Sequence, residues 1–265
     1  MNKQIDSFKH AILAEWIKGR RTFLRLSPIV FAIIPILIPT AIFFRDFIHT
    51  ERAIEYIQNM GIEYDPILSF SKLCFRFWVF FVLPVYCIFF AILNYQTEHT
   101  QGLWKHINAQ PISGTTQAMA KQVYAWCYIT FTTLLLFALV VAISLFVKFY
   151  NPPLGLSLNS APFWIQSFQH SIVSIAHGMI IVSILNFFAA RFSGATVPIM
   201  VGSIGCMLPI AYEPTYSMAP YIPWLYNVVL LELGSFSPAW VAIPVIHIAT
   251  ALAIHFVWQK DAPLY

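Results

Sequence analysis

The sequence predicts an all-α integral membrane protein with six membrane-spanning helices. Only 10% of its 265 residues are charged and 59% are hydrophobic, whereas soluble domains carry about 25% charged residues. The mean hydropathy is +0.71, and each span requires ~20 apolar residues. We therefore expect a single transmembrane domain over residues 1–265. Any module that hydrolyses ATP or catalyses a reaction is expected on another chain, and the net charge of +4 is expected to set membrane orientation rather than to bind nucleic acid.

Residues 4–26 are expected to form an amphipathic elbow helix on the cytosolic leaflet. Apolar residues alternate here with basic ones; the apolar set is Ile5, Phe8, Ile12, Trp16 and Phe23, and the basic set is Lys9, Lys18, Arg20, Arg21 and Arg25. This pattern is typical of helices that lie in the membrane interface. The segment either couples to a partner protein or anchors the chain on its positive side, and both roles are compatible.

The membrane topology follows from the apolar runs and from the placement of the basic residues. The six spans are expected at about 28–44, 72–93, 122–147, 164–190, 195–212 and 240–258, with outer loops at 45–70 and 148–163. With both termini in the cytosol, the inner bases are Lys3, Lys9, Lys18, Arg20, Arg21, Arg25, Lys105, Lys121, Arg191 and Lys260. Fewer bases lie outside, namely Arg45, Arg52, Lys72, Arg76 and Lys148. This asymmetry obeys the positive-inside rule.

Residues 213–239 have an unusual composition, with several prolines, many aromatic residues and no Lys or Arg. The apolar run from Trp224 to Leu233 is too short to span a membrane. We therefore expect a re-entrant or interfacial helix pair on the outer side, before the last span. Glu213 and Glu232 flank this segment and are candidates for a gating or substrate-path role, or for a position at the headgroup level.

The loop between the second and third spans has a helical pattern of its own. An apolar edge formed by Leu103, Trp104 and Ile107 predicts a short helix, which Pro111 would end. Ser113 can cap the helix that follows. Glu98, at the expected start of the loop helix, suits the positive end of the helix dipole. Exposed polar groups beside this apolar edge, namely Glu98, His99, Gln101, Lys105 and His106, predict a surface that contacts a partner.

Two segments together resemble a known family. The first is the N-terminal helix A-E-W-I-K-G-R-R-T-F-L, and the second is the loop pattern E-x-x-x-G-L-W-K-x-I-x-A-x-P-I-S, which runs from Glu98 to Ser113. They resemble the type-two ABC exporter permeases, most closely the small six-span permeases of bacitracin-type and lantibiotic-immunity transporters. The most specific part of the match is Glu98 with Gly102-Leu103-Trp104-Lys105 and Pro111-Ile112-Ser113.

This resemblance implies a transport subunit of the bacterial inner membrane with no cofactor and no ATPase site of its own. Two permeases, identical or different, would pair and bind ATP-binding subunits that hold ATP and Mg²⁺. The substrate would be an amphipathic compound such as an antimicrobial peptide, expelled outward. The implied partner-coupling residues are Glu98, Gly102, Leu103, Trp104, Lys105, Ile107 and Pro111 of the loop, with Trp16, Arg20 and Arg21 of the elbow.

A second hypothesis uses the histidines in the spans. His177 and His247 lie in the fourth and sixth spans and would each offer one axial ligand to a haem or contact a quinone, which would make the chain a subunit of a membrane oxidoreductase. Ionisable residues inside membranes are functional candidates, although a neutral histidine can also pack between helices. We expect no metal site, because the four cysteines lie in apolar runs without C-x-x-C spacing.

Overall fold

In the computed structural model every described element is a helix. The structure describes residues 2–20, 22–49, 66–100, 113–150, 161–192 and 194–211, together with Trp224, Val245 and Ala249. Its elements are α1 (Asn2–Arg20), the 3-10 helix η1 (Phe23–Arg25), α2 (Ser27–His49), α4 (Pro66–Phe77), the π-helical turn η2 (Trp78–Val82), α5 (Leu83–Thr100), α7 (Gly114–Tyr150), α8 (Ala161–Arg191) and α9 (Thr196–Ala211). Over these ranges the all-helical prediction is confirmed.

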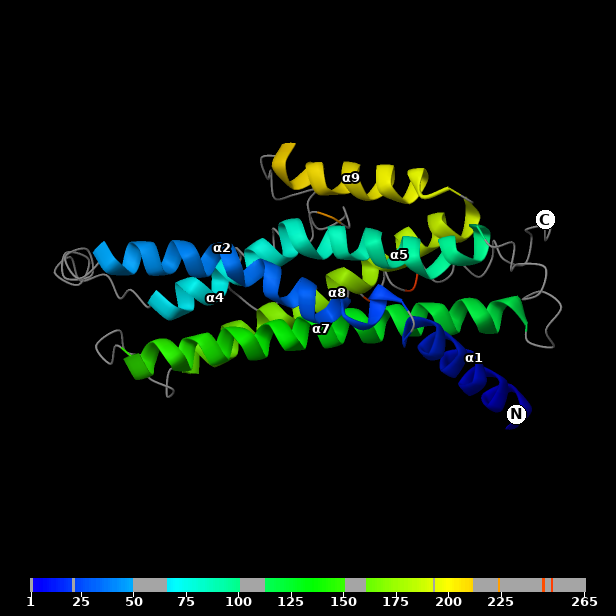
Figure 1. The fold of residues 1–265 in the computed structure, drawn as a ribbon, viewed down its shortest axis with the longest axis horizontal. Helices are drawn as coiled ribbons and strands as arrows, with labels where there is room; N and C mark the ends of the chain where they lie inside the picture. Colours follow the sequence, from blue (N-terminus) through cyan, green and yellow to red (C-terminus); the bar gives the residue numbers. More distant parts are fainter. Residues whose placement is uncertain are drawn as a thin grey trace.

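The long helices form a bundle in which successive helices run in alternating directions (Figure 1). Within it α8 packs against α5 and α7, α2 packs against α7 and α4, and α9 packs against α5 and α8. Helix α1 leaves the bundle at an angle, at the end where α5 finishes and α7 begins (Figure 1). The 101–112 loop therefore emerges from the same end of the bundle at which α1 lies.

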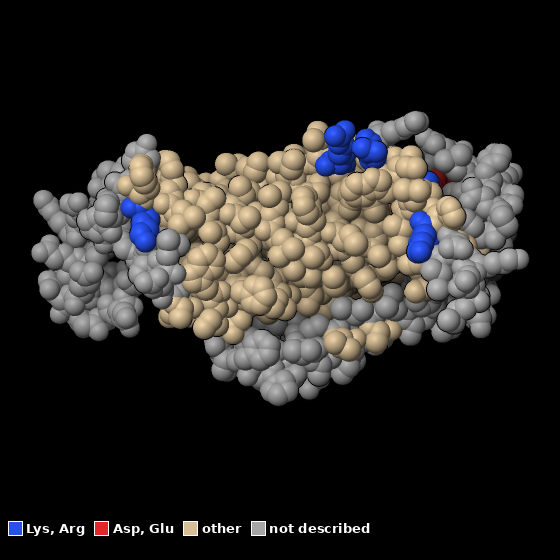
Figure 2. Space-filling view, turned by 90° about the horizontal axis from the view of Figure 1, so that it is seen from below, with Lys and Arg blue, Asp and Glu red and all other residues tan. Residues whose placement is uncertain are grey.

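The bundle has the length and composition of a membrane domain. Among the described residues, three helices are long and apolar enough to cross a membrane, at Ile67–Tyr95, Gly114–Phe149 and Ala161–Arg191. Shorter apolar helices lie at Ser27–Ile42 and Thr196–Leu208. On the face drawn in Figure 2, most of the described surface carries neither basic nor acidic side chains. The six-span topology stays a prediction, because the expected sixth span and the pair at 213–239 fall almost entirely outside the described residues.

The core is unusually aromatic, and it packs around the helix that runs from α4 through η2 to α5. Trp78, Tyr86 and Phe90 are fully buried there. The ring of Tyr86 lies 6.2 Å from both Trp78 and Phe90, measured between centroids. This packing fixes the rotation of α5, and therefore the direction in which the side chains at its end point.

The π-helical turn has an identifiable cause. Pro84 lacks an N–H to donate to the carbonyl of Phe80, and its ring would clash with that carbonyl in a regular α-helix. At this point the backbone N–H of Leu83 donates to the carbonyl of Trp78, which is the five-residue spacing of a π-helix. The wider turn lets a single continuous helix pass through the proline.

Several predicted boundaries differ from the helices of the structure. The expected elbow helix over 4–26 is interrupted, because α1 ends at Arg20 and Thr22 caps η1 by accepting a hydrogen bond from the N–H of Leu24. The expected outer loop at 45–70 is shorter at both ends, since α2 continues to His49 and α4 starts at Pro66. Helix α7 begins at Gly114, as expected from Ser113, whose hydroxyl accepts from the N–H of Thr116 and caps the first turn, and it continues through the span expected from about 122.

Candidate functional site

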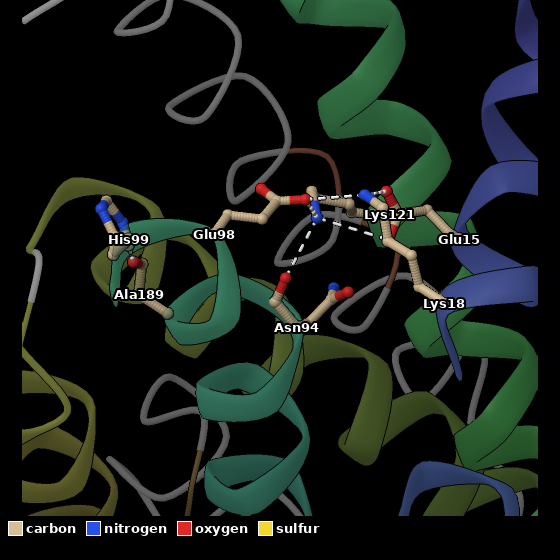
Figure 3. Close-up of polar contacts among 7 residues, drawn as sticks. All are labelled: Glu15, Lys18, Asn94, Glu98, His99, Lys121 and Ala189. Carbon is tan, nitrogen blue, oxygen red and sulfur yellow. Dashed lines mark hydrogen bonds and ion pairs between the residues drawn. The ribbon is translucent and has the colours of Figure 1, made fainter. Parts of the chain in front are cut away.

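Four charged side chains meet where α1, α5 and α7 converge (Figure 3). Glu15 and Lys18 come from α1, Glu98 comes from the last turn of α5, and Lys121 comes from the second turn of α7. We call this group the ion cluster. It lies at the base of the 101–112 loop, because Glu98 precedes the loop and Lys121 follows it.

Lys121 is the centre of the ion cluster. Its Nζ lies 2.7 Å from Oε1 of Glu98, 3.3 Å from Oε2 of Glu15 and 3.0 Å from the backbone oxygen of Asn94. The ammonium group also lies 5.1 Å from the centre of the Tyr95 ring, within the range of a cation–π contact. An ammonium has three N–H donors, so these three oxygens satisfy it completely.

Lys18 completes the ion cluster from α1. Its Nζ lies 2.8 Å from Oε1 of Glu15 and 2.8 Å from Oε1 of Glu98. The same oxygen of Glu98 therefore accepts from both lysines. The other carboxylate oxygen, Oε2, is buried and has no hydrogen-bond partner among the described residues.

Burial decides how strongly these charges interact. Glu98 is 2% exposed and Lys121 is 3% exposed, whereas the Lys18 side chain is 49% exposed. Burial alone would raise the pKa of Glu98, but the positive charges of Lys121 and Lys18 outweigh it and lower that pKa. Burial opposes the charge of Lys18 in the same way, yet Glu15 and Glu98 hold its pKa above the usual value. Glu98 and Lys18 are thus charged at neutral pH, and the ion cluster balances two basic groups against two acidic ones.

Close packing brings α1 to this place. A Cβ atom at Gly19 would overlap the hydroxyl of Tyr124 on α7, so a larger residue at this position would require Tyr124 or α1 to shift. One turn earlier, the Trp16 ring lies 6.4 Å from the Tyr128 ring. Because Glu15 and Lys18 flank these contacts, the docking of α1 carries both charges into the ion cluster.

A second link ties the end of α5 to α8. A ring nitrogen of His99 lies 3.2 Å from the backbone oxygen of Ala189 (Figure 3), near the end of α8. The end of α5 is therefore held by α1, α7 and α8 together, immediately before the loop begins.

The structure corrects the prediction for Glu98. It was expected near the start of a loop helix and exposed to a partner, but it lies in the last turn of α5 and is buried. A carboxylate is unfavourable at the negative end of a helix dipole, and the two lysines provide the compensation. The sequence signal for this arrangement is Lys121, a charged residue at the edge of a long apolar run. Composition alone does not show that Lys121 pairs with Glu98.

The other predicted coupling residues fall into two groups. Trp16 and Arg20 lie on exposed positions of α1. Arg21 and the loop residues Gly102, Leu103, Trp104, Lys105, Ile107 and Pro111 lie outside the described residues. The same holds for Glu213, Glu232 and His247, whose roles stay predictions.

His177 is buried within the bundle, on α8. Its Nδ1 has no hydrogen-bond partner among the described residues. The described part of the chain contains no group of three or more His, Cys, Asp or Glu side chains that could hold a metal ion. The haem or quinone role of His177 with His247 stays a prediction.

Comparison with protein families identifies a match over most of the chain. The family model described as "ABC-2 family transporter protein" matches residues 11–209. No curated protein matches the chain. The matched range extends from α1 to α9 and includes the whole ion cluster.

Proposed function

Because this chain belongs to the ABC-2 family of transporter proteins, it is a permease subunit of an ABC transporter, and we propose that it exports an amphipathic compound such as an antimicrobial peptide. Separate ATP-binding subunits, which hold ATP and Mg²⁺, supply the energy. Two permease chains and two such subunits form the working assembly in a bacterial cytoplasmic membrane, with both termini in the cytosol.

The observation that carries the coupling part of this proposal is the ion cluster at the base of the 101–112 loop. An ATP-binding subunit that displaces this loop acts on Glu98 before it and on Lys121 after it. A buried ion pair resists separation, because removing one partner leaves an uncompensated charge at a cost of about 3–5 kcal/mol. The displacement therefore moves α5, α7 and α1 together rather than deforming one helix end.

The proposed contact surface combines the loop with the exposed side of α1. Trp16 and Arg20 lie on that side, and α1 lies at the end of the bundle where α5 finishes and α7 begins (Figure 1). The apolar loop residues Leu103, Trp104 and Ile107 supply the anchor for the partner. Interfaces commonly join an aromatic or arginine anchor with a polar rim.

The proposed cargo and direction are supported by the resemblance of the loop to immunity permeases. The apolar exterior of the bundle is compatible with a substrate that partitions into the lipid. Exposed side chains on α2 include Ile29, Ile33 and Leu37, and an amphipathic peptide dissolved in the lipid would meet such a surface. Expulsion from the membrane requires no aqueous channel across the whole bilayer.

Co-purification tests the assembly. The native chain and a Trp104→Ala variant are expressed with candidate ATP-binding subunits and extracted in mild detergent. We expect the native chain to retain an ATP-binding subunit and the variant to lose it or to uncouple its hydrolysis. Lys148→Met serves as the control, because Lys148 lies in the last turn of α7, at the other end of the bundle from the loop. Absence of any ATP-binding subunit from the native preparation would contradict the proposal.

Transport into inside-out vesicles tests the cargo and its direction. Export from the cell corresponds to uptake by such vesicles, so a fluorescent cationic amphipathic peptide should accumulate inside them only when ATP is supplied. A neutral, strongly polar peptide of equal length is the matched control. Uptake by right-side-out vesicles with ATP sealed inside would show the opposite direction and refute the export assignment.

A further inference from the structure

The buried Lys121 belongs to α7, but its ammonium group contacts residues of two other helices, α1 and α5. Lys121 of α7 donates to Glu98 and Asn94 of α5 and to Glu15 of α1. These acceptors use all three of its donors, and they come from the two neighbouring helices. Lys121 therefore hydrogen-bonds α1 and α5 at the same time from α7.

Lys18 and Lys121 differ in how much free energy is needed to separate each of them from Glu98. Lys18 is half-exposed, so its ammonium can exchange Glu98 for water at little cost, as exposed ion pairs do. Lys121 is buried together with Glu98, and separating that pair would leave two charges without solvent. The contact of Lys121 with Glu98 is thus the permanent one, and the contact made by Lys18 is releasable.

We infer that Lys121 is a positioning residue of the transport cycle, which holds Glu15 and Glu98 at one point so that α1 and both borders of the 101–112 loop move as a single unit. This inference rests on the proposed function, because it assigns Lys121 to the relay of motion from the ATP-binding subunit. It concerns a residue that need not contact that subunit or the substrate.

The competing role is purely structural, in which Lys121 only stabilises the folded bundle. Charge balance provides a variant that separates the two roles. Replacing Lys121 alone leaves two carboxylates against one lysine in the buried site. Replacing both partners, as Glu98→Gln with Lys121→Met, leaves the neutral pair of Glu15 and Lys18 on α1. We expect this double variant to fold, because the packing of α1 on Tyr124 and Tyr128 remains, while the ionic link from Lys121 to Glu15 and Glu98 is lost.

A distance measurement on the chain alone, without a partner protein, tests whether the ionic link of Lys121 holds α1 to α7. Cys127 and Cys206 are replaced by Ala, because both are at least partly exposed and would react with the spin label. Labels are then attached at cysteines introduced in place of Ile17 of α1 and Met119 of α7, which are 50% and 43% exposed. We expect a narrow distance distribution in the native background and in the control Lys148→Met. The double variant should give a broad distribution, and Lys121→Arg, which keeps the charge, should stay close to native.

Reconstitution with the ATP-binding subunits tests the role in transport. The readout is peptide transported per ATP hydrolysed, which a merely structural role would leave unchanged in a folded complex. We expect the double variant to assemble and hydrolyse ATP but to lose roughly tenfold in this ratio, within the range by which single sites change coupling. Lys121→Arg should retain most of it.

The failures of the two proposals give different results. A native-like distance distribution and a native-like transport ratio in the double variant would overturn the role of Lys121 and leave the permease assignment intact. A native chain that retains no ATP-binding subunit would overturn the proposed function, and the role of Lys121 in transport with it. In that case a broad distance distribution in the double variant would still show that the Lys121 link holds α1 to α7 in the isolated chain.

Discussion

The ammonium of Lys121 and the carboxylate of Glu98 meet at 2.7 Å, each almost completely buried, across the two helices that border the 101–112 loop. They are separated in the chain by the loop itself, so their contact closes the loop at its base. The residues on either side of the loop are therefore held together by this ion pair.

Removing one member of this pair should destabilise the protein more than removing both. Glu98→Gln leaves an excess positive charge in the ion cluster and Lys121→Met leaves an excess negative charge, and each should cost about 3–5 kcal/mol. The double variant restores neutrality and should cost less than either single change. Thermal unfolding in detergent measures the three variants, and simple additivity of the two single effects would contradict the assignment.

Acid should weaken the docking of α1. The pKa of Glu98 is lowered in the folded protein, so its contribution to stability is present above the pKa of an unfolded glutamate, about 4.3, and is lost as the pH falls through the lower folded value. We expect constant thermal stability from neutral pH to about 5 and a decline below about 4. The Glu98→Gln variant should show a smaller acid-dependent decline, because it lacks the carboxylate whose pKa is lowered in the folded protein.

Alkaline conditions should act through Lys18 in the opposite direction. Its pKa is raised, so its contribution is present below the usual lysine value of about 10.4 and disappears only as the pH rises through the higher folded value. Thermal stability should therefore not decline through loss of this contact between pH 7 and about 10. Because the side chain is half-exposed, Lys18→Met should have a much smaller effect than Lys121→Met. A larger effect of Lys18→Met would contradict the division between a releasable and a permanent contact.

Gly19→Ala should push α1 away from α7. The added methyl group would overlap the hydroxyl oxygen of Tyr124, and overpacking of this kind costs about 1–3 kcal/mol. Tyr124→Phe removes the overlapped oxygen, which is buried without a hydrogen-bond partner among the described residues, so the double variant should recover part of the loss. Limited proteolysis within residues 20–26 and thermal unfolding report the two effects. Equal behaviour of the single and double variants would refute this packing.

The polar link between α7 and α8 should contribute to bundle stability. The Gln122 side chain donates to the hydroxyl of Ser183 at 2.8 Å and accepts from the Asn186 side chain at 3.0 Å. Interhelical hydrogen bonds in membranes contribute about 0.6–2 kcal/mol, and Gln122→Leu would remove both contacts and leave Asn186 buried. We expect a loss near the upper end of that range by thermal or denaturant unfolding. Gln122→Glu, which keeps the acceptor for Asn186, is the matched comparison and should differ from Gln122→Leu.

Composition and periodicity predicted the helical membrane domain because both are local properties of the chain. The long apolar runs around Phe90, Leu136 and Ile181 mark helices wherever they pack. The cap at Ser113 was also predicted correctly, since a serine before a helix acts within one turn. The break after Arg20 was missed, because it depends on Thr22 and on the docking of α1 against Tyr124.

The ion cluster could not be predicted from local patterns. Lys121 lies on a helix that follows the loop, Glu98 on the helix before it, and Glu15 near the start of the chain. Only the packing of three helices brings them together, and sequence spacing carries no information about that packing. Glu98 was predicted to be exposed, and this prediction was wrong because its partners are distant in the sequence.

The π-helical turn at Trp78–Val82 has a geometric consequence for the far end of the same helix. A turn of this kind holds one more residue than an α-helical turn, and each residue of an α-helix advances the direction of its side chain by about 100°. If the turn relaxed to regular α-helix while its start stayed fixed, every later side chain would rotate by about that angle around the axis. Glu98 would then point away from Lys121. The direction of the Glu98 carboxylate at the end of α5 is therefore set by the π-helical turn that Pro84 imposes in the middle of the same helix.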